Sequence, residues 1–415
     1  MRVIKHFQQP WHWMALTLGL ACPLAYGAAS QTPTNRLSQP ILIQKAAQAF
    51  MQQYHIAGLT IGITQHGQHQ VYSYGVISRK NQQPVNADTL FEIGSISKTL
   101  NVTLASQAQH QGKLSLSKQP SVYLPMLKGS ALDQVSLLNL ATHTTGGFPL
   151  QLPDDIHTDD QLMDYFVHWQ PKDAANTHRQ YANPSIGLLG LITAKQLQQP
   201  YADALKQQVL LPLGMTSTDI NVPAKNANRY AQGYKKDQTP VRLNPAPLAD
   251  EAYGIKSSAN DLLRLIDANL GLLKINAALQ QAIDNTHIGY FDVPTAAPAP
   301  VDMPIDTPTA HMTQALIWEQ YHYPVTLNTL LAGNSSHMVY DSVSVTRLTP
   351  PQRPQRQVWI NKTGATNGFG AYIAFIPSEQ LGIVILANTN HPTDARIRLA
   401  YQIMQSMLAT PHTKP

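Results

Sequence analysis

Both ends of the chain carry the hydrophobic patterns of a helix and of paired strands. Near the start, the segment PILIQKAAQAFMQQYHI (40–56) repeats apolar residues at helical spacing, and Pro40 suits a first helical turn. The next segment, LTIGITQHGQHQVYSYGV (59–76), predicts two strands that turn at Gly67. This end therefore predicts a helix followed by a β-hairpin.

The C-terminal end repeats these elements in the opposite order. Segments 369–376 and 381–388 are continuously apolar and read as strands joined by the short turn PSEQ. A helix is predicted from Thr393, with Ile397, Ala400, Met404, Met407 and Leu408 on one face. The economical arrangement is an α+β fold, in which both chain ends build one antiparallel sheet and helices pack on it.

The middle of the chain is helical in period and broken by many loops. We expect a sheet subdomain of roughly residues 30–110 and 310–415, and a mostly helical subdomain of roughly 111–309. A cleft between the two parts is the natural place for a site. The segment FDVPTAAPAPVDMPIDTP (291–308) is rich in proline, lacks periodicity and predicts an extended surface loop.

The first 29 residues read as a secretory signal peptide. Arg2 and Lys5 precede an apolar stretch that is too short to span a bilayer, and cleavage is predicted after Gly27 or Ala29. The only cysteine, Cys22, lies inside this stretch, so the mature protein would have neither a disulfide nor a thiol nucleophile. We expect a periplasmic protein without a membrane anchor.

Composition excludes some classes of partner. Hydrophobic residues make up 43% of the 415 residues, which is enough for a globular core. Charged residues are 13%, about half the usual share, and the net charge is +5. Because no run of Lys or Arg is dense enough for a nucleic-acid stripe, we expect no nucleic-acid partner.

Ser95 and Lys98 form the first candidate for chemistry, within FEIGSISKTL (91–100). Ser95 follows a glycine and opens a predicted helix, where the positive end of the helix dipole would stabilise developing negative charge. A lysine amine beside the hydroxyl can accept its proton if burial or nearby positive charge lowers the lysine pKa. The same spacing recurs at Ser115 and Lys118, which lie in a connection and read as surface.

Two further motifs carry polar groups at the edges of predicted elements. Tyr181-Ala182-Asn183 precedes Pro184, which predicts extended geometry at Asn183 before a helix begins. Lys362-Thr363-Gly364 is predicted to begin a strand, where glycine lets a substrate backbone approach closely. Each motif alone is weak evidence.

In this order, S-x-x-K, Y-A-N and K-T-G form the signature of the penicillin-recognising serine hydrolases. The chain closely resembles class C serine β-lactamases of the AmpC type over nearly its whole mature length. The resemblance is carried by the segments LLNLATHTTGGFPLQLPDD (137–155), INVPAKNANRYAQGY (220–234), DEAYGIKSS (250–258) and KTGATNGFGAYIAFIPSEQLGIVILANTNHP (362–392).

The resemblance implies hydrolysis of cephalosporins and penicillins, with antibiotic resistance as the result. Ser95 would attack the lactam carbonyl and form an acyl-enzyme, with Lys98, Tyr181 and Lys362 as catalytic partners and with no cofactor or metal. It leaves open whether Tyr181 or Lys98 is the base. The implied substrate-binding residues are Gln151, Asn183, Tyr253, Thr363, Gly364, Ala365, Asn390 and Arg396. The amides of Ser95 and Ala365 would form the oxyanion hole, and the protein would be a monomer.

Some positions depart from the family pattern. His143 stands where the family usually has tyrosine and reads as structural, and Thr393 replaces a common asparagine. Thr393 is predicted to cap the last helix, so carboxylate binding would depend on Lys362, Thr363 and Arg396.

Three other functions remain open from the sequence. A D-alanyl-D-alanine carboxypeptidase or a β-lactamase-like esterase could share the motifs, and a penicillin-binding sensor would acylate without turnover. A zinc hydrolase would need ligands, and the H-x-x-H pair His66 and His69 lies in a hairpin turn without a neighbouring Asp or Cys.

Overall fold

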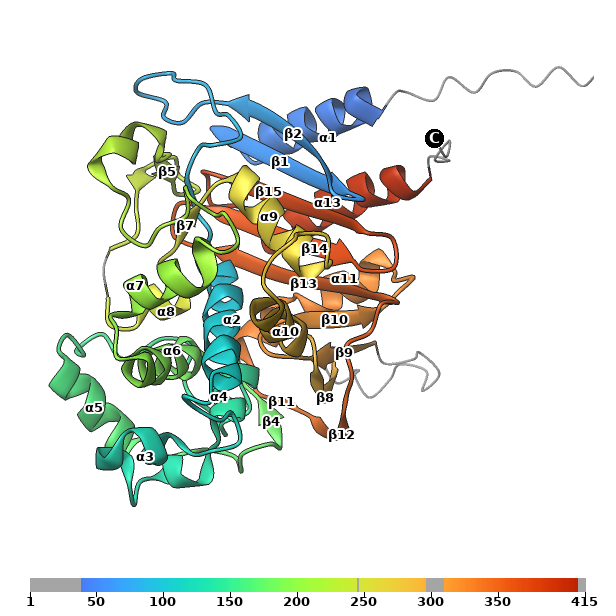
Figure 1. Cartoon of the computed structure of the whole chain (residues 1–415). Coiled ribbons are helices and arrows are strands. Elements are labelled where there is room, and N and C mark those ends of the chain that lie inside the picture. The colour runs from blue at the N-terminus through green and yellow to red at the C-terminus, as the bar shows by residue number, and fades with distance from the viewer. Residues whose placement is uncertain (1–38, 245, 296–309, 410–415) are drawn as a thin grey trace, which may run out of the picture. The chain divides into compact units, whose positions relative to one another are not determined.

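A single large antiparallel sheet organises the computed structural model, which describes residues 39–244, 246–295 and 310–409 (Figure 1). Its strand order is β12-β8-β9-β10-β13-β14-β15-β1-β2. The strands are β1 Gly58–Gln65, β2 Gln68–Gly75, β8 Gly289–Pro294, β9 His311–Gln314, β10 Glu319–His322, β12 Thr346–Gln352, β13 Val358–Ala365, β14 Gly370–Ile376 and β15 Leu381–Ala387. The signal peptide predicted for residues 1–29 lies outside the described residues.

The two chain ends meet inside this sheet. β1 pairs with β2 across the turn at Gly67 and with β15 on its other side, so that Ile61 lies opposite Ile385. β14 pairs with both β13 and β15. The predicted α+β fold, with one antiparallel sheet built from both termini and helices packed on it, is confirmed.

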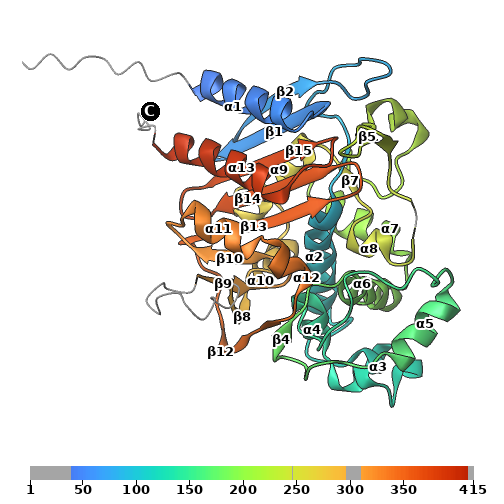
Figure 2. The ribbon, with the colours of Figure 1, turned by 180° about the vertical axis from the view of Figure 1, so that it is seen from behind.

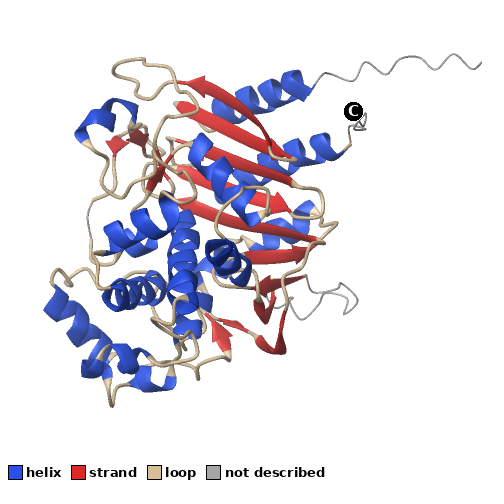
Figure 3. Ribbon diagram, viewed as in Figure 1, coloured by secondary structure: helices blue, strands red, loops and turns tan. Residues whose placement is uncertain are grey.

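Helices cover both faces of the sheet, as Figures 2 and 3 show. Successive side chains of β14 point to opposite faces of the sheet and so belong to two different hydrophobic cores. Tyr372 and Ala374 join the cluster beneath α1 (Gln39–Gln53) and α13 (Thr393–Leu408). Ile373 and Phe375 point to the opposite face, where α9 (Ala259–Asn269) and α10 (Ala277–Asn285) lie. α11 (Leu327–Gly333) and α12 (Ser336–Tyr340) complete the covering layers.

A third hydrophobic cluster belongs to the helical part of the chain. The helices that contribute to it are α2 Ser97–His110, α3 Pro120–Tyr123, α4 Leu137–Thr142, α5 Asp159–His168, α6 Asn183–Leu197 and α8 Ala249–Ala252. The short helix α7, Tyr201–Leu205, packs into the cluster that also holds Ile373 and Phe375. Three two-stranded ribbons pair β3 Phe91–Glu92 with β7 Lys256–Ser257, β4 His178–Arg179 with β11 Val343–Ser344, and β5 Gly233–Tyr234 with β6 Pro240–Val241. α2 lies between this part and the sheet (Figure 1).

The structure differs from the predicted elements at several places. Residues 291–294, predicted as the start of a proline-rich loop, belong to β8, where Phe291 and Val293 are buried. The rest of that loop up to 308 lies outside the described residues, apart from the buried Thr295. Two elements from the predicted helical subdomain belong with the sheet instead. α9 packs on the sheet, and β8 is one of its strands. The chain from Gln39 onward forms one compact unit.

Three secondary-structure boundaries also move. K-T-G ends β13 instead of beginning a strand, because the run from Val358 already pairs with β10 and, from Ile360 onward, with β14. α6 begins at Asn183, since Pro184 is tolerated in the first helical turn. α2 begins at Ser97, after a 3₁₀ turn, η1, over Gly94–Ile96. Within the described residues, no helix is long and apolar enough to cross a bilayer.

Candidate active site

Ser95 lies at the bend between β3 and α2. Gly94, in front of it, has φ +52°, a left-handed conformation that favours glycine. Ser95 is half-buried in η1, and the chain then continues directly into α2. The local sequence therefore holds the hydroxyl at the beginning of a fourteen-residue helix.

The end of β13 packs directly against this bend because two glycines leave room for it. A Cβ atom on Gly94 would come within 2.5 Å of the Ala365 amide nitrogen. A Cβ atom on Gly364 would collide with the carbonyl oxygen of Ile93. The close approach places the backbone of Ala365 beside the residue that precedes Ser95.

Lys98 is the second residue of α2 and has no exposed surface. Its Nζ donates to Ser95 Oγ at 3.0 Å and to the Ala252 carbonyl of α8 at 2.9 Å. Burial lowers the pKa of Lys98 to about 8; the nearby Lys362 also lowers it, whereas Tyr181 acts in the opposite direction. The amine is thus held at the hydroxyl and can lose its proton near neutral pH.

Tyr181 stands immediately before α6, between the two lysines. Lys98 Nζ lies 5.2 Å and Lys362 Nζ 5.0 Å from its ring centroid. Burial would raise the pKa of Tyr181, but Lys362 and Lys98 outweigh it and bring the pKa down to about 8. The phenol oxygen is buried and forms no hydrogen bond of good geometry with a described residue, although Ser95 and Lys98 lie near enough to favour its anionic form.

The K-T-G residues form the other side of the site. Lys362 is 2% exposed and its Nζ donates to the Thr363 carbonyl at 3.2 Å. Thr363 is half-buried, Gly364 buried and Ala365 exposed, so that the strand end becomes more open towards its terminus. The structure brings Ser95, Lys98, Tyr181 and Lys362 together from three distant parts of the sequence.

The predicted substrate-binding residues are distributed around this centre. Asn183 begins α6, is 7% exposed and has a buried Oδ1 without a hydrogen-bond partner among the described residues. Gln151 is exposed on a loop that is tied to α6, because the Asn183 amide donates to Leu150. Tyr253 follows α8 and is half-buried. Asn390 donates to the Thr366 carbonyl at 3.1 Å, just beyond the end of β13.

Arg396, another predicted substrate-binding residue, is almost completely buried. It is 1% exposed, and its guanidinium fills the space where a side chain on Gly370 would lie. The prediction that Thr393 caps α13 is wrong, because Pro392 is the cap residue. Thr393 Oγ1 instead accepts a hydrogen bond from Arg396 Nη2 at 2.7 Å. Arg396 is therefore held inside the protein and is not exposed to a substrate.

Several residues that support the site carry no signal in the sequence. Glu92 is 1% exposed and accepts hydrogen bonds from Tyr230, Leu243 and Thr366, which fixes the loop that follows β13. Asn101 donates to the Glu251 and Ile186 carbonyls and so ties α2 to α8 and α6. Only tertiary contacts distinguish these residues from other polar side chains.

Arg179 and His143 also contact Tyr181. The buried Arg179 lies with its guanidinium carbon 5.7 Å from the Tyr181 ring centroid and pairs with Glu319 of β10. The His143 ring lies 4.5 Å from that of Tyr181. A helical or strand pattern could not have indicated these contacts, because they join β4, α4 and β10.

The H-x-x-H pair is used for other contacts. His66 Nδ1 lies 2.9 Å from Gln380 Oε1, and His69 Nε2 lies 2.6 Å from Asp267. Within the part of the chain that the structure describes, no group of three or more His, Cys, Asp or Glu residues is placed to hold a metal ion.

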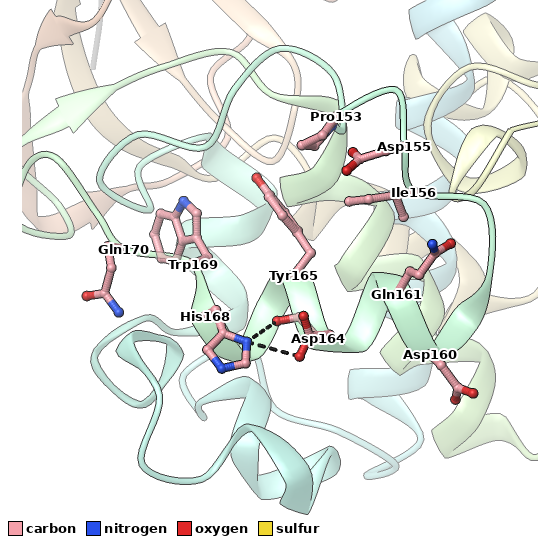
Figure 4. A pocket seen from close by; sticks show the side chains of 10 residues that line it. All are labelled: Pro153, Asp155, Ile156, Asp160, Gln161, Asp164, Tyr165, His168, Trp169 and Gln170. Atoms are coloured by element: carbon pink, nitrogen blue, oxygen red, sulfur yellow. Dashed lines mark hydrogen bonds and ion pairs between the residues drawn. The ribbon is translucent and has the colours of Figure 1, made fainter.

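A hollow of about 780 Å³ lies away from these catalytic groups, along α5 (Figure 4). Its lining residues are Pro153, Asp155, Ile156, Asp160, Gln161, Asp164, Tyr165, His168, Trp169 and Gln170. Trp169 is fixed by stacking on Phe148, with ring centroids 4.0 Å apart. No nucleophile with an adjacent base lines this hollow, so chemistry is assigned to the residues around Ser95.

Comparison with known proteins agrees with this assignment. The family model described as Beta-lactamase matches residues 43–407. A beta-lactamase from Lysobacter lactamgenus is 46% identical over 382 residues, which cover 92% of this chain and 95% of that protein.

Solved structures give the same result. A class C beta-lactamase in complex with cefoxitin has a TM-score of 0.83 and 46% identity, covering 89% of this chain and 98% of that one. A beta-lactamase/D-alanine carboxypeptidase from Pseudomonas syringae has a TM-score of 0.83 and 47% identity, covering 91% and 100%. The extent of these matches and the S-x-x-K, Y-A-N and K-T-G groups around one serine show that this chain belongs to the beta-lactamase family, in its class C serine branch.

Proposed function

We propose that the protein hydrolyses the β-lactam ring of cephalosporins and penicillins through an acyl-enzyme on Ser95, and thereby confers resistance to them. The observation that carries the proposal is the 3.0 Å hydrogen bond from Lys98 to Ser95, next to a phenol that lies between two lysines. A hydroxyl is a weak nucleophile until a neighbouring base accepts its proton.

In the acylation step, Ser95 Oγ attacks the lactam carbonyl carbon while its proton passes to Tyr181 or Lys98. The carbonyl oxygen becomes an oxyanion, which the Ser95 and Ala365 amides would stabilise. The C–N bond of the lactam then breaks, and the nitrogen receives the proton. In the second step a water molecule, deprotonated by the same base, cleaves the ester and releases Ser95.

The residues around the centre orient the substrate in this proposal. Lys362 and Thr363 would bind the substrate carboxylate at the end of β13, with Gly364 and Ala365 alongside the substrate. Gln151 and Asn183 would hold the side-chain amide of the substrate, and the unpartnered Asn183 Oδ1 supports such a role. Tyr253 would line the side-chain pocket, and Asn390 would position the loop after β13. Arg396 is 1% exposed, so the direct carboxylate contacts are assigned to Lys362 and Thr363.

The decisive experiment is hydrolysis of a chromogenic cephalosporin by the purified mature protein, followed with and without a strong chelator. We expect turnover in both conditions, and a raised inhibitory concentration of cephalosporin for a susceptible bacterium that expresses the gene. Loss of turnover with the chelator that zinc restores would contradict the serine mechanism.

A second candidate activity is D-alanyl-D-alanine carboxypeptidase, because one close structural relative is named for both activities. The two differ in which acyl-enzyme is hydrolysed quickly. Release of D-alanine from a peptide ending in D-Ala-D-Ala, measured beside cephalosporin hydrolysis, separates them. We expect kcat/KM to be larger for the cephalosporin.

We also propose that the protein is exported to the periplasm as a monomer. The charged, apolar and small-residue pattern of residues 1–29 supports export. N-terminal sequencing of the protein from a periplasmic extract, with light scattering of the purified form, tests both points. A retained Met1 or a stable dimer would contradict the respective point.

A further inference from the structure

His143 has an unusual backbone position for a histidine. It ends α4 with φ 60° and ψ 30°, the left-handed conformation in which glycine and asparagine are common. The residue is 1% exposed. Its carbonyl accepts a hydrogen bond from the Gln180 amide at 2.9 Å, which ties the end of α4 to the segment that carries Tyr181.

The imidazole contacts the same segment from the other side of Tyr181. The Ala182 amide donates to His143 Nδ1 at 3.3 Å, and the two rings lie 4.5 Å apart at 49°. The hydrogen bonds therefore hold the backbone amides of the residues before and after Tyr181. A backbone restrained on both sides limits where the phenol oxygen can lie.

The geometry also determines which form of the imidazole is present. A backbone amide can only donate, so Nδ1 must be an acceptor and Nε2 carries the hydrogen. Nε2 is buried and has no hydrogen-bond partner among the described residues. Burial lowers the pKa of His143 well below its usual value, and the nearby Arg179, Lys98 and Lys362 lower it further. The ring therefore stays neutral and adds no fourth cation.

We propose that His143 is a positioning residue, whose neutral imidazole holds the Tyr181 hydroxyl between Lys98 and Lys362. This inference rests on the proposed β-lactam hydrolysis. The charged groups that face His143 and Tyr181 come from the elements packed around them. They are Lys98 of α2, Lys362 of β13 and Arg179 of β4, whose charge Glu319 of β10 partly compensates. If the segment loosens, Tyr181 moves away from the cations and its ionisation needs a higher pH.

The test compares two substitutions of His143 that separate the acceptor from the ring. His143→Asn places an amide oxygen near the position of Nδ1 and suits the left-handed backbone. His143→Phe keeps an aromatic ring but leaves the Ala182 amide without its acceptor. We expect the Phe variant to lower kcat roughly tenfold with KM nearly unchanged, and to move the ascending limb of the kcat–pH profile upward. The Asn variant should keep a profile close to that of the natural protein.

Two additional variants separate positioning from a merely structural role. His143→Gly removes the acceptor while relieving the backbone strain, so it should reproduce the pH shift even if the Phe variant does not fold. His287→Phe is a matched control, since His287 is also buried but bonds Asn269 and packs against Trp318 and Phe375. It should lower thermal stability without moving the pH profile.

The outcomes distinguish this inference from the proposed function. If the natural protein hydrolyses cephalosporin and forms its Ser95 adduct, while the Gly and Phe variants keep its kcat and pH profile, the inference is wrong and the proposed function stands. If the natural protein forms no adduct and shows no hydrolysis, the proposed function itself fails.

Discussion

Two segments of this chain carry the same serine–lysine spacing, and their surroundings differ completely. Lys98 has no exposed surface and donates to Ser95 Oγ at 3.0 Å. Lys118 is exposed, and Ser115 Oγ lies 2.9 Å from the hydroxyl of Ser117. The backbone of the second segment forms a turn, in which the Lys118 amide donates to the Ser115 carbonyl.

The difference arises from elements that are distant in sequence. β13 packs onto the Ser95 bend and α8 supplies the Ala252 carbonyl for Lys98, so that the lysine is desolvated beside a second lysine. The Ser115 turn bonds to segments that are near it in the sequence. Its Leu116 and Lys118 carbonyls accept from the start of α4, and its Ser115 and Leu116 amides donate to Tyr123 and Gln109. A desolvated amine can become a base, whereas an exposed one remains an ordinary surface cation.

The largest expected effect is on the nucleophile. Ser95→Ala should abolish both the covalent β-lactam adduct and turnover, because the Ser95 hydroxyl is the aliphatic hydroxyl that accepts from the buried Lys98 amine. Intact-protein mass spectrometry after incubation with a β-lactam measures the adduct. Ser115→Ala is the matched control and should react like the natural protein. An adduct that persists in Ser95→Ala and disappears in Ser115→Ala would identify Ser115 as the nucleophile.

The next largest effect concerns the phenol beside the first pair. Tyr181→Phe should lower kcat by about 10²–10⁴-fold, the usual contribution of a positioned proton carrier, with the fold retained. Stopped-flow hydrolysis with a circular dichroism control measures this. Because Tyr181 raises the pKa of Lys98, its removal should lower that pKa. If kcat stays near normal and the ascending limb of the kcat–pH profile moves to lower pH, Lys98 is the base.

The close approach of β13 can be disturbed by one methyl group. Gly364→Ala should lower kcat/KM by roughly 10–10²-fold and reduce the melting temperature, because its Cβ would collide with the Ile93 carbonyl. Gly112→Ala, beside the Ser115 turn, is the control. Gly112 has φ +70° but open space around it, so stability should fall by about 1 kcal/mol with activity unchanged. Equal kinetics in both variants would show that β13 contact does not shape the site.

The pH dependence tests the electrostatics of the first pair. Burial and Lys362 lower the pKa of Lys98, and the two lysines lower that of Tyr181 against the effect of burial, each to about 8. Whichever group is the base must lose its proton, so the acylation rate should rise with pH along a limb near 8, about tenfold per pH unit below it. Pre-steady-state acylation between pH 5 and pH 10 measures this limb. A limb centred near 10 would contradict the lowered pKa values.

The smallest effect is expected at the start of α13. Thr393→Asn should change kcat/KM for a cephalosporin less than twofold, because Thr393 Oγ1 is already bound by the buried Arg396. Steady-state kinetics with thermal stability in parallel measures this. A several-fold gain would mean that the carboxylate end of the site extends to position 393.

The sequence predicted the sheet well wherever pattern and turn chemistry agree. The turn at Gly67 and the apolar runs of β14 and β15 give strands close to the predicted bounds. It placed K-T-G at the wrong end of its strand, because the upstream run from Val358 is interrupted by the polar Asn361. Asn361 is nevertheless buried, since it donates to Glu319 across the strand pair β10–β13.

In the candidate site, too, local sequence patterns identified residue types but not their tertiary contacts. The order of three motifs was sufficient to select Ser95 over Ser115, because each motif supplies a group that the others need. The interpretation of His143 as structural missed its contacts with the residues on both sides of Tyr181. The sequence did not indicate that Arg396 is buried, because its burial depends on the packing of α13 against β14.

The sequence by itself therefore determined the class of fold, the family and the identity of the serine, lysine and tyrosine groups. Those features follow from periodicity and from residue types at short spacing, which are local properties. The tertiary structure alone decided the desolvation of Lys98, the position of Tyr181 between two cations and the burial of Arg396. Burial and Coulomb interactions depend on distances between elements far apart in the chain, so local sequence patterns do not determine them.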